Sequence, residues 1–185
     1  YPLKRGSPDC IVTPPLNLVL INTKKSDDLS EFQRRWIARV APICKAYDLH
    51  LTLFNFKIDD SPINFAKKIA PSTSIGEGGK RLVELAQKGK VQITDLSLPQ
   101  NLGIIVICTS KPEQNKEKSI GYISKLLNNE KIALIFGCDE HQNQITKKIR
   151  ADSKYHLDIT GKGIKLTLDS EIGAVTSILS KTRKD

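Results

Sequence analysis

The chain has 185 residues, of which 39% are apolar and 26% charged, a composition typical of one soluble domain with a substantial core. No apolar run approaches the length needed to cross a bilayer, which argues against a membrane-spanning protein. The formal charge of +9 favours a polyanionic partner such as RNA, because lysine and arginine contacts to phosphate release counterions. Charge alone leaves open a basic surface with no nucleic-acid partner.

The cysteines and histidines do not form a metal-binding pattern. None of the four cysteines belongs to a C-x-x-C pair, and the three histidines complete no zinc-finger spacing. Cys44 and Cys108 lie within apolar patterns and are expected to be core thiols. We therefore expect no structural metal and a reducing, cytoplasmic location.

The first fifteen residues, YPLKRGSPDCIVTPP, are rich in proline and predict an arm that precedes a single domain of residues 16–185. The run Leu16–Asn22 is continuously apolar, as in a strand buried on both faces. A helix should follow, capped at residues 26–28, and Pro42 should kink it or end it near Ala41. Its predicted inward stripe is Leu29, Phe32, Trp36, Val40 and Cys44.

Strands and helices alternate along the rest of the chain. The further predicted strands are His50–Phe56, Val91–Leu96, Leu102–Ser110, Ile132–Gly137 and Tyr155–Ile159. The further predicted helices are Ser61–Ala70, one within Ser74–Lys90, Ser119–Asn128, Gln142–Arg150 and Ser170–Lys181. This alternation predicts an α/β fold, with a mostly parallel sheet covered by helices on both faces. Ligands then bind in loops at the carboxyl ends of the strands, which are the loops after Asn22, Phe56, Ser110, Gly137 and Ile159.

The connection between Ile159 and the last helix is unusually long, at roughly ten residues where a few are common. It contains two glycines, and Ile164, Leu166 and Leu168 alternate as they do in a buried segment. A buried loop must find partners for its backbone polar groups.

Several segments are candidate sites, each with a plainer interpretation. Thr109–Glu113 offers hydroxyls, amides and Lys111 to an anion, but taken alone it is better explained as a turn enforced by proline. In Phe136–Glu140, Gly137 permits either a positive φ or close backbone approach to a ligand. Its two acidic residues meet a ribose or cation, or they cap the next helix. These two interpretations have equal weight.

The remaining candidates are basic or contain histidine. Gly76–Lys80 lacks the spacing of a phosphate-binding loop, which leaves a single RNA phosphate or a flexible hinge. Arg35 and Arg39 project from one helix face, where the plainer interpretation is a solvated basic surface. His156 is expected to be structural, and no Ser–His–Asp, Cys–His or paired-carboxylate constellation is present.

The last third of the chain resembles the SPOUT, or α/β-knot, RNA methyltransferases. The matching segments are IALIFGCDE and ADSKYHLDITGKGIKLTLDSEIGAV, with IIVICTSKP as the earlier loop. Within them, Ile132–Gly137, Ile159–Gly163, Lys165–Leu168 and Gly173–Ala174 fit the family pattern in order. The whole chain, including TSIGEGGKRLVELA, is similar to a small archaeal family in that superfamily.

This resemblance implies a C-terminal trefoil knot, a homodimer and S-adenosylmethionine held by the backbone of three loops. The cofactor-binding residues implied are Thr109, Ser110, Gly137, Cys138, Ile159, Gly161, Ile164 and Leu166. Arg39 best matches the arginine proposed to act on the RNA hydroxyl, with Arg35 in reserve. The basic residues expected to contact RNA are Lys80, Arg81, Lys111, Lys162 and Lys165.

The implied function is methylation of structured tRNA or rRNA, at a ribose 2′-oxygen or a base nitrogen. The family's Ser-Leu-Asn-like stretch reads Lys165, Leu166 and Thr167 here, so the methylated atom stays open. The alternatives are a non-catalytic RNA-binding protein and a protein that binds another small ligand, each with the same fold.

Overall fold

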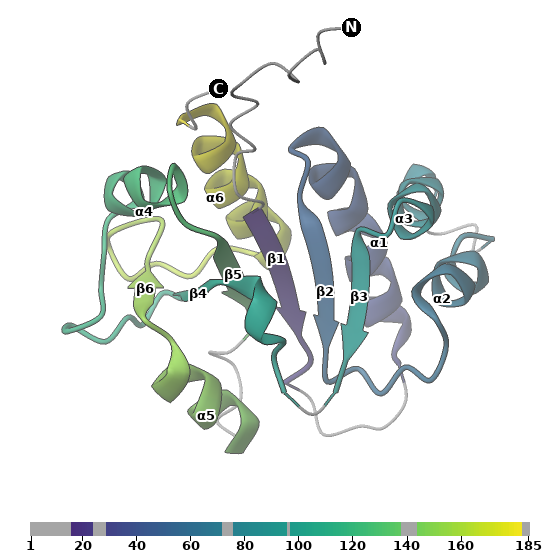
Figure 1. Ribbon diagram of the computed structural model, residues 1–185, viewed down its shortest axis with the longest axis horizontal. Helices are drawn as coiled ribbons and strands as arrows, with labels where there is room; N and C mark the ends of the chain where they lie inside the picture. Colours follow the sequence, from purple (N-terminus) through teal and green to yellow (C-terminus); the bar gives the residue numbers. More distant parts are fainter. Residues whose placement is uncertain (1–15, 24–28, 72–75, 96, 138–143, 183–185) are drawn as a thin grey trace, which may run out of the picture.

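The computed structural model describes residues 16–23, 29–71, 76–95, 97–137 and 144–182. Its centre is a six-stranded sheet in which all neighbouring strands are parallel, in the order β3-β2-β1-β5-β4-β6 (Figure 1). The strands are β1 (Leu16–Ile21), β2 (His50–Phe54), β3 (Val91–Thr94), β4 (Ile104–Cys108), β5 (Ile132–Phe136) and β6 (Tyr155–Leu157). The predicted α/β fold is confirmed. The proposed arm, residues 1–15, lies outside the described residues.

Six helices and a short 3₁₀ helix accompany the sheet. They are α1 (Glu31–Ala46), α2 (Pro62–Ile69), α3 (Glu77–Gln87), α4 (Ile120–Leu127), α5 (Gln144–Asp152), α6 (Leu168–Thr182) and η1 (Gln100–Leu102). Every helix predicted from the sequence is present, with bounds shifted by a few residues. Among the described residues, no helix is long and apolar enough to cross a membrane.

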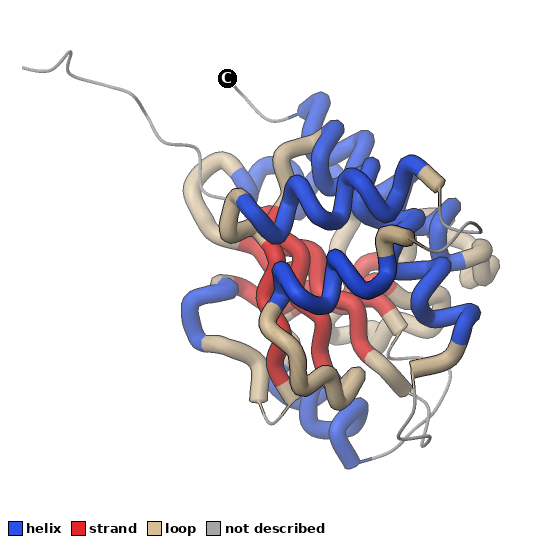
Figure 2. Tube along the Cα trace, turned by 90° about the vertical axis from the view of Figure 1, so that its right-hand side faces the viewer, coloured by secondary structure: helices blue, strands red, loops and turns tan. Residues whose placement is uncertain are grey.

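Helices cover both faces of the sheet, but unequally. Leu18 and Leu20 of β1 join a core to which α1, α2, α3, α4 and α6 all contribute. Val19 and Ile21 face the other way, into a smaller core that includes Ile149 of α5. Figure 2 shows the helices gathered mainly on one side of the strands. Both central strands, β1 and β5, are buried along their whole length, as their continuous apolar sequences predict.

The order of the strands creates a crevice between β1 and β5. From β1 the chain moves outward to β2 and β3, whereas from β5 it crosses β4 to reach β6. The connections after two neighbouring strands therefore leave in opposite directions. In parallel sheets, ligands bind at such a switch point, beyond the carboxyl ends of the strands.

Helix α1 begins later than the sequence suggested. Its N-cap is Ser30, whose hydroxyl accepts from the Gln33 amide, while the Gln33 side chain accepts from the Ser30 N–H. The expected caps at residues 26–28 lie outside the described residues. The stripe through Trp36 and Cys44 is buried, as predicted, but the inward placement of Phe32 is wrong because 64% of this residue is exposed.

The prediction that the first helix ends near Ala41 is wrong, because α1 continues through Pro42 to Ala46; the kink at Pro42 stays a prediction. A proline lacks the N–H that would bond the carbonyl four residues earlier, which is that of Ala38. Gly78 of α3 packs against this carbonyl so closely that an added Cβ would lie 2.3 Å from the Ala38 oxygen. Gly78 thus allows helices α1 and α3 to pack closely, whereas Gly76, with a φ of 56°, has open space around it.

The prediction that Cys44 and Cys108 are core thiols is confirmed, because both are buried. Burial raises the pKa of the Cys44 thiol to about 12. The described residues contain no cluster of histidine, cysteine and acidic side chains suited to a metal.

Candidate functional site

A pocket of about 260 Å³ opens at the switch point between β1 and β5. The ends of these two strands, the first turns of α1, and the segment that leads into α6 surround it. The residues that line it are Ile21, Asn22, Thr23, Phe32, Gln33, Trp36, Gly137, Lys165, Leu166, Thr167, Leu168 and Glu171. A larger hollow of about 680 Å³ lies beside β3, but none of the predicted site residues lines it.

Gly137 closes one wall of the pocket at the end of β5. Its φ of 97° belongs to the left-handed region, and an added Cβ would lie 2.8 Å from the Ile21 carbonyl oxygen. Any other residue here would be strained and would clash with β1. The positive φ that the sequence argument offered for Gly137 is therefore confirmed, while close approach of a ligand to this glycine stays a prediction.

A chain of amides fixes the floor between β1 and α1. The Gln33 side chain donates to Asn22 Oδ1 at 2.8 Å, and Asn55 donates to the Asn22 carbonyl at 3.0 Å. Asn22 and Gln33 are both buried. Because buried amides are stable only when hydrogen-bonded, these contacts hold α1 in register with the ends of β1 and β2.

Trp36 is the exception to this pattern of satisfied polar groups. It lies one turn beyond Phe32 on the same face of α1, and 9% of the residue is exposed. Its indole nitrogen is the one buried side-chain nitrogen or oxygen of the described residues that has no hydrogen-bond partner. An unsatisfied buried donor costs about 1–3 kcal/mol, so this wall of the pocket is destabilised unless a ligand supplies an acceptor.

The long connection after β6 reaches the pocket from the edge of the sheet. It starts at Asp158 and passes the end of β4, where Gly163 approaches the Ser110 carbonyl. It then contributes Leu166 and Thr167 to the pocket opposite β1. The connection is long because it crosses two strands, each about 4.8 Å wide.

The expectation that this connection is buried is wrong. Ile164 is 56% exposed, and Leu166 and Leu168 are half-buried. The backbone is instead satisfied within the loop. The Asp158 carboxylate accepts from the amides of Thr160 and Gly163, and the Thr160 hydroxyl accepts from Lys162 and Ile164. The alternation of apolar residues wrongly predicted burial, because a loop whose backbone groups are hydrogen-bonded by its own side chains need not pack into the core.

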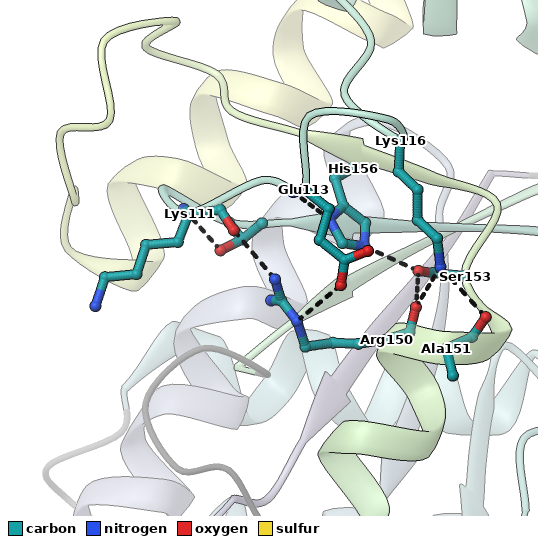
Figure 3. A network of polar contacts seen from close by, with 8 residues as sticks. Lys111, Glu113, Lys116, Arg150, Ala151, Ser153 and His156 are labelled. Carbon is teal, nitrogen blue, oxygen red and sulfur yellow. Dashed lines mark hydrogen bonds and ion pairs between the residues drawn. The ribbon is translucent and has the colours of Figure 1, made fainter.

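The loop after β4 is fastened to α5 and β6 by a polar network around His156 (Figure 3). The Glu113 amide donates to His156 Nδ1 at 3.0 Å, and Nε2 lies 3.0 Å from the Ser153 hydroxyl. Arg150 donates to the Lys111 carbonyl at 3.1 Å. Lys116 donates to the last carbonyls of α5, at 2.7 Å from that of Arg150.

These contacts assign the protonation of His156. Since Nδ1 accepts from a backbone amide, Nε2 carries the proton and donates to Ser153, whose hydroxyl donates to the Arg150 carbonyl at 2.6 Å. Burial, reinforced by the positive charge of Arg150, lowers the pKa of His156 to about 4. His156 is thus a neutral structural residue, as expected.

The cofactor-binding residues implied by the resemblance occupy three neighbouring loops, but only some border the pocket. Gly137 and Leu166 line it. The Thr109 amide donates to the Leu157 carbonyl at 3.0 Å, which joins the loops after β4 and β6. Of the remaining predicted residues, Ser110, Ile159, Gly161 and Ile164 lie on these loops outside the pocket lining. Cys138, with its acidic neighbours Asp139 and Glu140, lies outside the described residues.

The predicted basic residues do not form one surface. Lys80 and Arg81 are on α3, which packs on α1 and α2 towards the β3 edge, and they form ion pairs with Glu77 and Glu84. Lys111 and Lys162 are on the loops after β4 and β6, the strands at the opposite edge of the sheet, whereas Lys165 lines the pocket. Sequence order gave no indication of this separation.

The arginines predicted to be catalytic lie on the outer surface of α1. Arg35 is exposed and pairs with Glu31 at 3.3 Å. Arg39 is exposed one turn beyond Trp36, and neither arginine lines the pocket. Sequence reasoning missed the residues that do line it from α1, namely Phe32, Gln33 and Trp36. The available signal was the position of Phe32 and Trp36 in the turns of α1 that follow the end of β1.

Comparison with known proteins identifies the family. A family model described as "Protein of unknown function (DUF531)" matches residues 16–180. The chain belongs to this family. A relative, "Uncharacterized protein MJ0224" of Methanocaldococcus jannaschii, is 32% identical over 164 residues, covering 89% of this chain and 92% of the relative. This agrees with the predicted similarity to a small archaeal family.

Solved structures share the fold at low sequence identity. A probable methyltransferase from Bordetella pertussis Tohama I has a TM-score of 0.61, with 8% identity over 92% of this chain and 97% of that one. TrmJ from Z. mobilis ZM4 gives 0.59, with 13% identity, 91% of this chain and 68% of that one. A probable methylase family protein from Haemophilus influenzae Rd KW20 gives 0.58, with 18% identity and 92% of this chain.

The chain spans 65% of the length of the Haemophilus protein. The predicted resemblance to the SPOUT methyltransferases is confirmed at the level of the fold. The knot itself remains a prediction.

Proposed function

We propose that this protein is an S-adenosylmethionine-dependent RNA methyltransferase. The observation that carries the proposal is the pocket at the switch point of a sheet whose fold is shared with proteins described as methyltransferases. The net charge of +9 supports a polyanionic substrate, and we propose structured tRNA or rRNA. The methylated atom, a ribose 2′-oxygen or a base nitrogen, stays open.

The loops after β4, β5 and β6 fit the cofactor because they lie together at the carboxyl ends of neighbouring strands and present backbone at their glycines. Gly137 adjoins Ile21 at a distance that excludes a Cβ, and Gly163 lies beside the Ser110 carbonyl. Such backbone-lined walls suit an adenosyl group recognised by main-chain amides and carbonyls. Thr109, Ser110, Gly137, Cys138, Ile159, Gly161, Ile164 and Leu166 are the residues proposed to hold it. When bound, the cofactor supplies an electrophilic methyl group.

The chain's own contribution to the reaction is to position the methyl-accepting nucleotide and to orient the proton that its hydroxyl or ring nitrogen loses. Arg39 is the proposed catalytic residue because it is exposed on α1 one turn beyond Trp36. A guanidinium stays charged, so Arg39 would orient and polarise the acceptor rather than store its proton. Arg35 is the alternative, although its ion pair with Glu31 restrains it.

We further propose that the protein is a cytoplasmic homodimer with the C-terminal segment threaded as a knot. The basis is the family resemblance of the last third of the chain. Lys111, Lys162 and Lys165 would contact RNA on the pocket side of the molecule. Lys80 and Arg81 would meet RNA only if it extends to the α3 side.

Calorimetry with S-adenosylmethionine tests the cofactor, and transfer of a labelled methyl group to unmodified total RNA tests the reaction. Nucleoside analysis of the product then gives the methylated atom. We expect Arg39→Ala to abolish transfer while cofactor affinity is unchanged, and Arg34→Ala on the same helix to serve as the matched control. Absence of cofactor binding would favour a non-catalytic RNA-binding protein or a protein for another small ligand.

A further inference from the structure

We propose that the pocket between β1 and α1 binds one unstacked nucleobase of the RNA. Phe32 supplies the stacking surface, and the Trp36 indole N–H donates to an acceptor atom on the base. This inference rests on the proposed function, because it assigns the acceptor side of the same site.

The position of the pocket indicates that it binds the methyl-accepting nucleotide rather than the cofactor. Of the proposed cofactor residues that the structure describes, Gly137 and Leu166 line it, while its opposite wall is formed by α1. The pocket thus adjoins the cofactor loops without coinciding with them. Two reactants that exchange a methyl group need this arrangement, since their reacting atoms must come within about 3–3.5 Å.

The size and shape of the pocket suit a single flat ring system. Its volume of about 260 Å³ lies just below the roughly 300–1,000 Å³ of pockets for larger small molecules. Phe32 is 64% exposed at this pocket although it is a large apolar residue. Aromatic side chains commonly stack on bases that have left their helix.

The chemistry of the wall also suits a base. Among the described residues, the Trp36 indole is the buried side-chain donor that lacks a partner, and every nucleobase offers carbonyl oxygens or ring nitrogens as acceptors. Enzymes that modify a base, or the sugar next to it, draw the nucleotide out of its stack into such a pocket. A pocket for one base needs few aromatic residues, whereas a surface that stacks several successive bases of a single strand needs many.

Trp36 makes the proposal directly measurable, since it is the only tryptophan of the chain. The probes are the four nucleoside 5′-monophosphates and random-sequence RNA pentanucleotides, each titrated against tryptophan fluorescence. We expect a saturable change with at least one monophosphate and with the pentanucleotides. Phe32→Ala should weaken that binding about tenfold, the effect of losing one stacked base, whereas Phe32→Tyr should preserve it.

Two further variants complete the test. Ile63→Ala, at another exposed apolar residue on α2, is the matched control and should leave the affinity unchanged. Trp36→Phe keeps a ring but removes the N–H, and calorimetry should then show about fivefold weaker binding of the preferred monophosphate, the size of one hydrogen bond. A loss confined to Phe32 and Trp36 would support the pocket.

Other outcomes overturn the proposal. It fails if no probe changes the fluorescence, if Phe32→Ala binds as the unaltered protein does, or if S-adenosylmethionine alone displaces the monophosphates by competition. Cofactor binding and methyl transfer without any nucleotide effect at Trp36 would remove this inference and leave the proposed function intact. Phe32-dependent nucleotide binding without cofactor binding would remove the proposed function and leave the base pocket.

Discussion

Two polar regions lie at the carboxyl edge of the same sheet and differ in how completely their groups are bonded. Around His156, both ring nitrogens and the Ser153 hydroxyl have partners, and the loop after β4 is held in place. Around Trp36, the buried indole donor has no partner among the described residues. A satisfied buried network indicates a scaffold, whereas an unsatisfied donor beside a pocket indicates a ligand.

The largest effect should come from removing the centre of the satisfied network. His156→Ala leaves the Glu113 amide and the Ser153 hydroxyl without their partner in a buried site, so we expect a loss of about 3–4 kcal/mol in the free energy of unfolding. Urea denaturation measures this. His50→Ala, at the half-buried start of β2, should cost under about 1 kcal/mol, and an equal loss in both variants would contradict the scaffold role.

The same residue should make stability depend on pH. The pKa of His156 is about 4 in the folded protein and about 6.5 when unfolded, so below pH 6.5 the unfolded chain takes up a proton that the folded protein does not. Stability should fall by about 3 kcal/mol as the pH drops from about 6.5 to about 4. In His156→Gln, this part of the pH dependence should disappear, and a curve unchanged by the substitution would refute the assignment.

A smaller effect is expected at the end of α5. Lys116 donates to the carbonyls of Arg150 and Ala151 at 2.7 and 3.3 Å, which belong to the last turn of α5 and have no backbone partner within the helix. Lys116→Met keeps the apolar stem and should cost about 1–2 kcal/mol in unfolding free energy. Lys148→Met, at an exposed position of the same helix, should be close to neutral.

The smallest effect on stability should come from substituting Trp36 in the wall of the pocket. Trp36→Phe removes an unsatisfied donor, which offsets the lost packing, so we expect the free energy of unfolding to change by less than about 1 kcal/mol. Thermal and urea denaturation of this variant beside His156→Ala compare the two regions directly. A loss at Trp36 as large as that at His156 would mean that the indole is a structural element of the core.

The sequence predicted the fold well because the central strands have an unambiguous pattern. Ile132–Phe136 is a continuous apolar run, Leu16–Ile21 is apolar except for Asn17, and both are buried throughout. The prediction of a helix end at Pro42 failed because tertiary packing, here the close contact of α1 with Gly78 of α3, overrides a local helix-breaking signal. It failed at Ile164 because the loop bonds to Asp158 instead of to a core.

The candidate site was less predictable than the fold. Gly137 was identified because glycine after a buried strand has few explanations. Phe32 and Trp36 were read only as core residues, since spacing along a helix gives a face but not what lies opposite it. Which end of α1 borders a pocket depends on the order of strands in the sheet, and that order is set by contacts distant in sequence.

The contact between Gly78 and the Ala38 carbonyl links two parts of the molecule whose roles differ. Helix α1 carries the aromatic wall of the pocket near its start, and α3 abuts its middle turn with no space for even a methyl group. A bulkier residue at position 78 would tilt α1 as a unit and displace Phe32 and Trp36 without touching either. Positions 42 and 78 should therefore change together when the protein diverges, and natural variation at α3 should alter ligand preference from a distance.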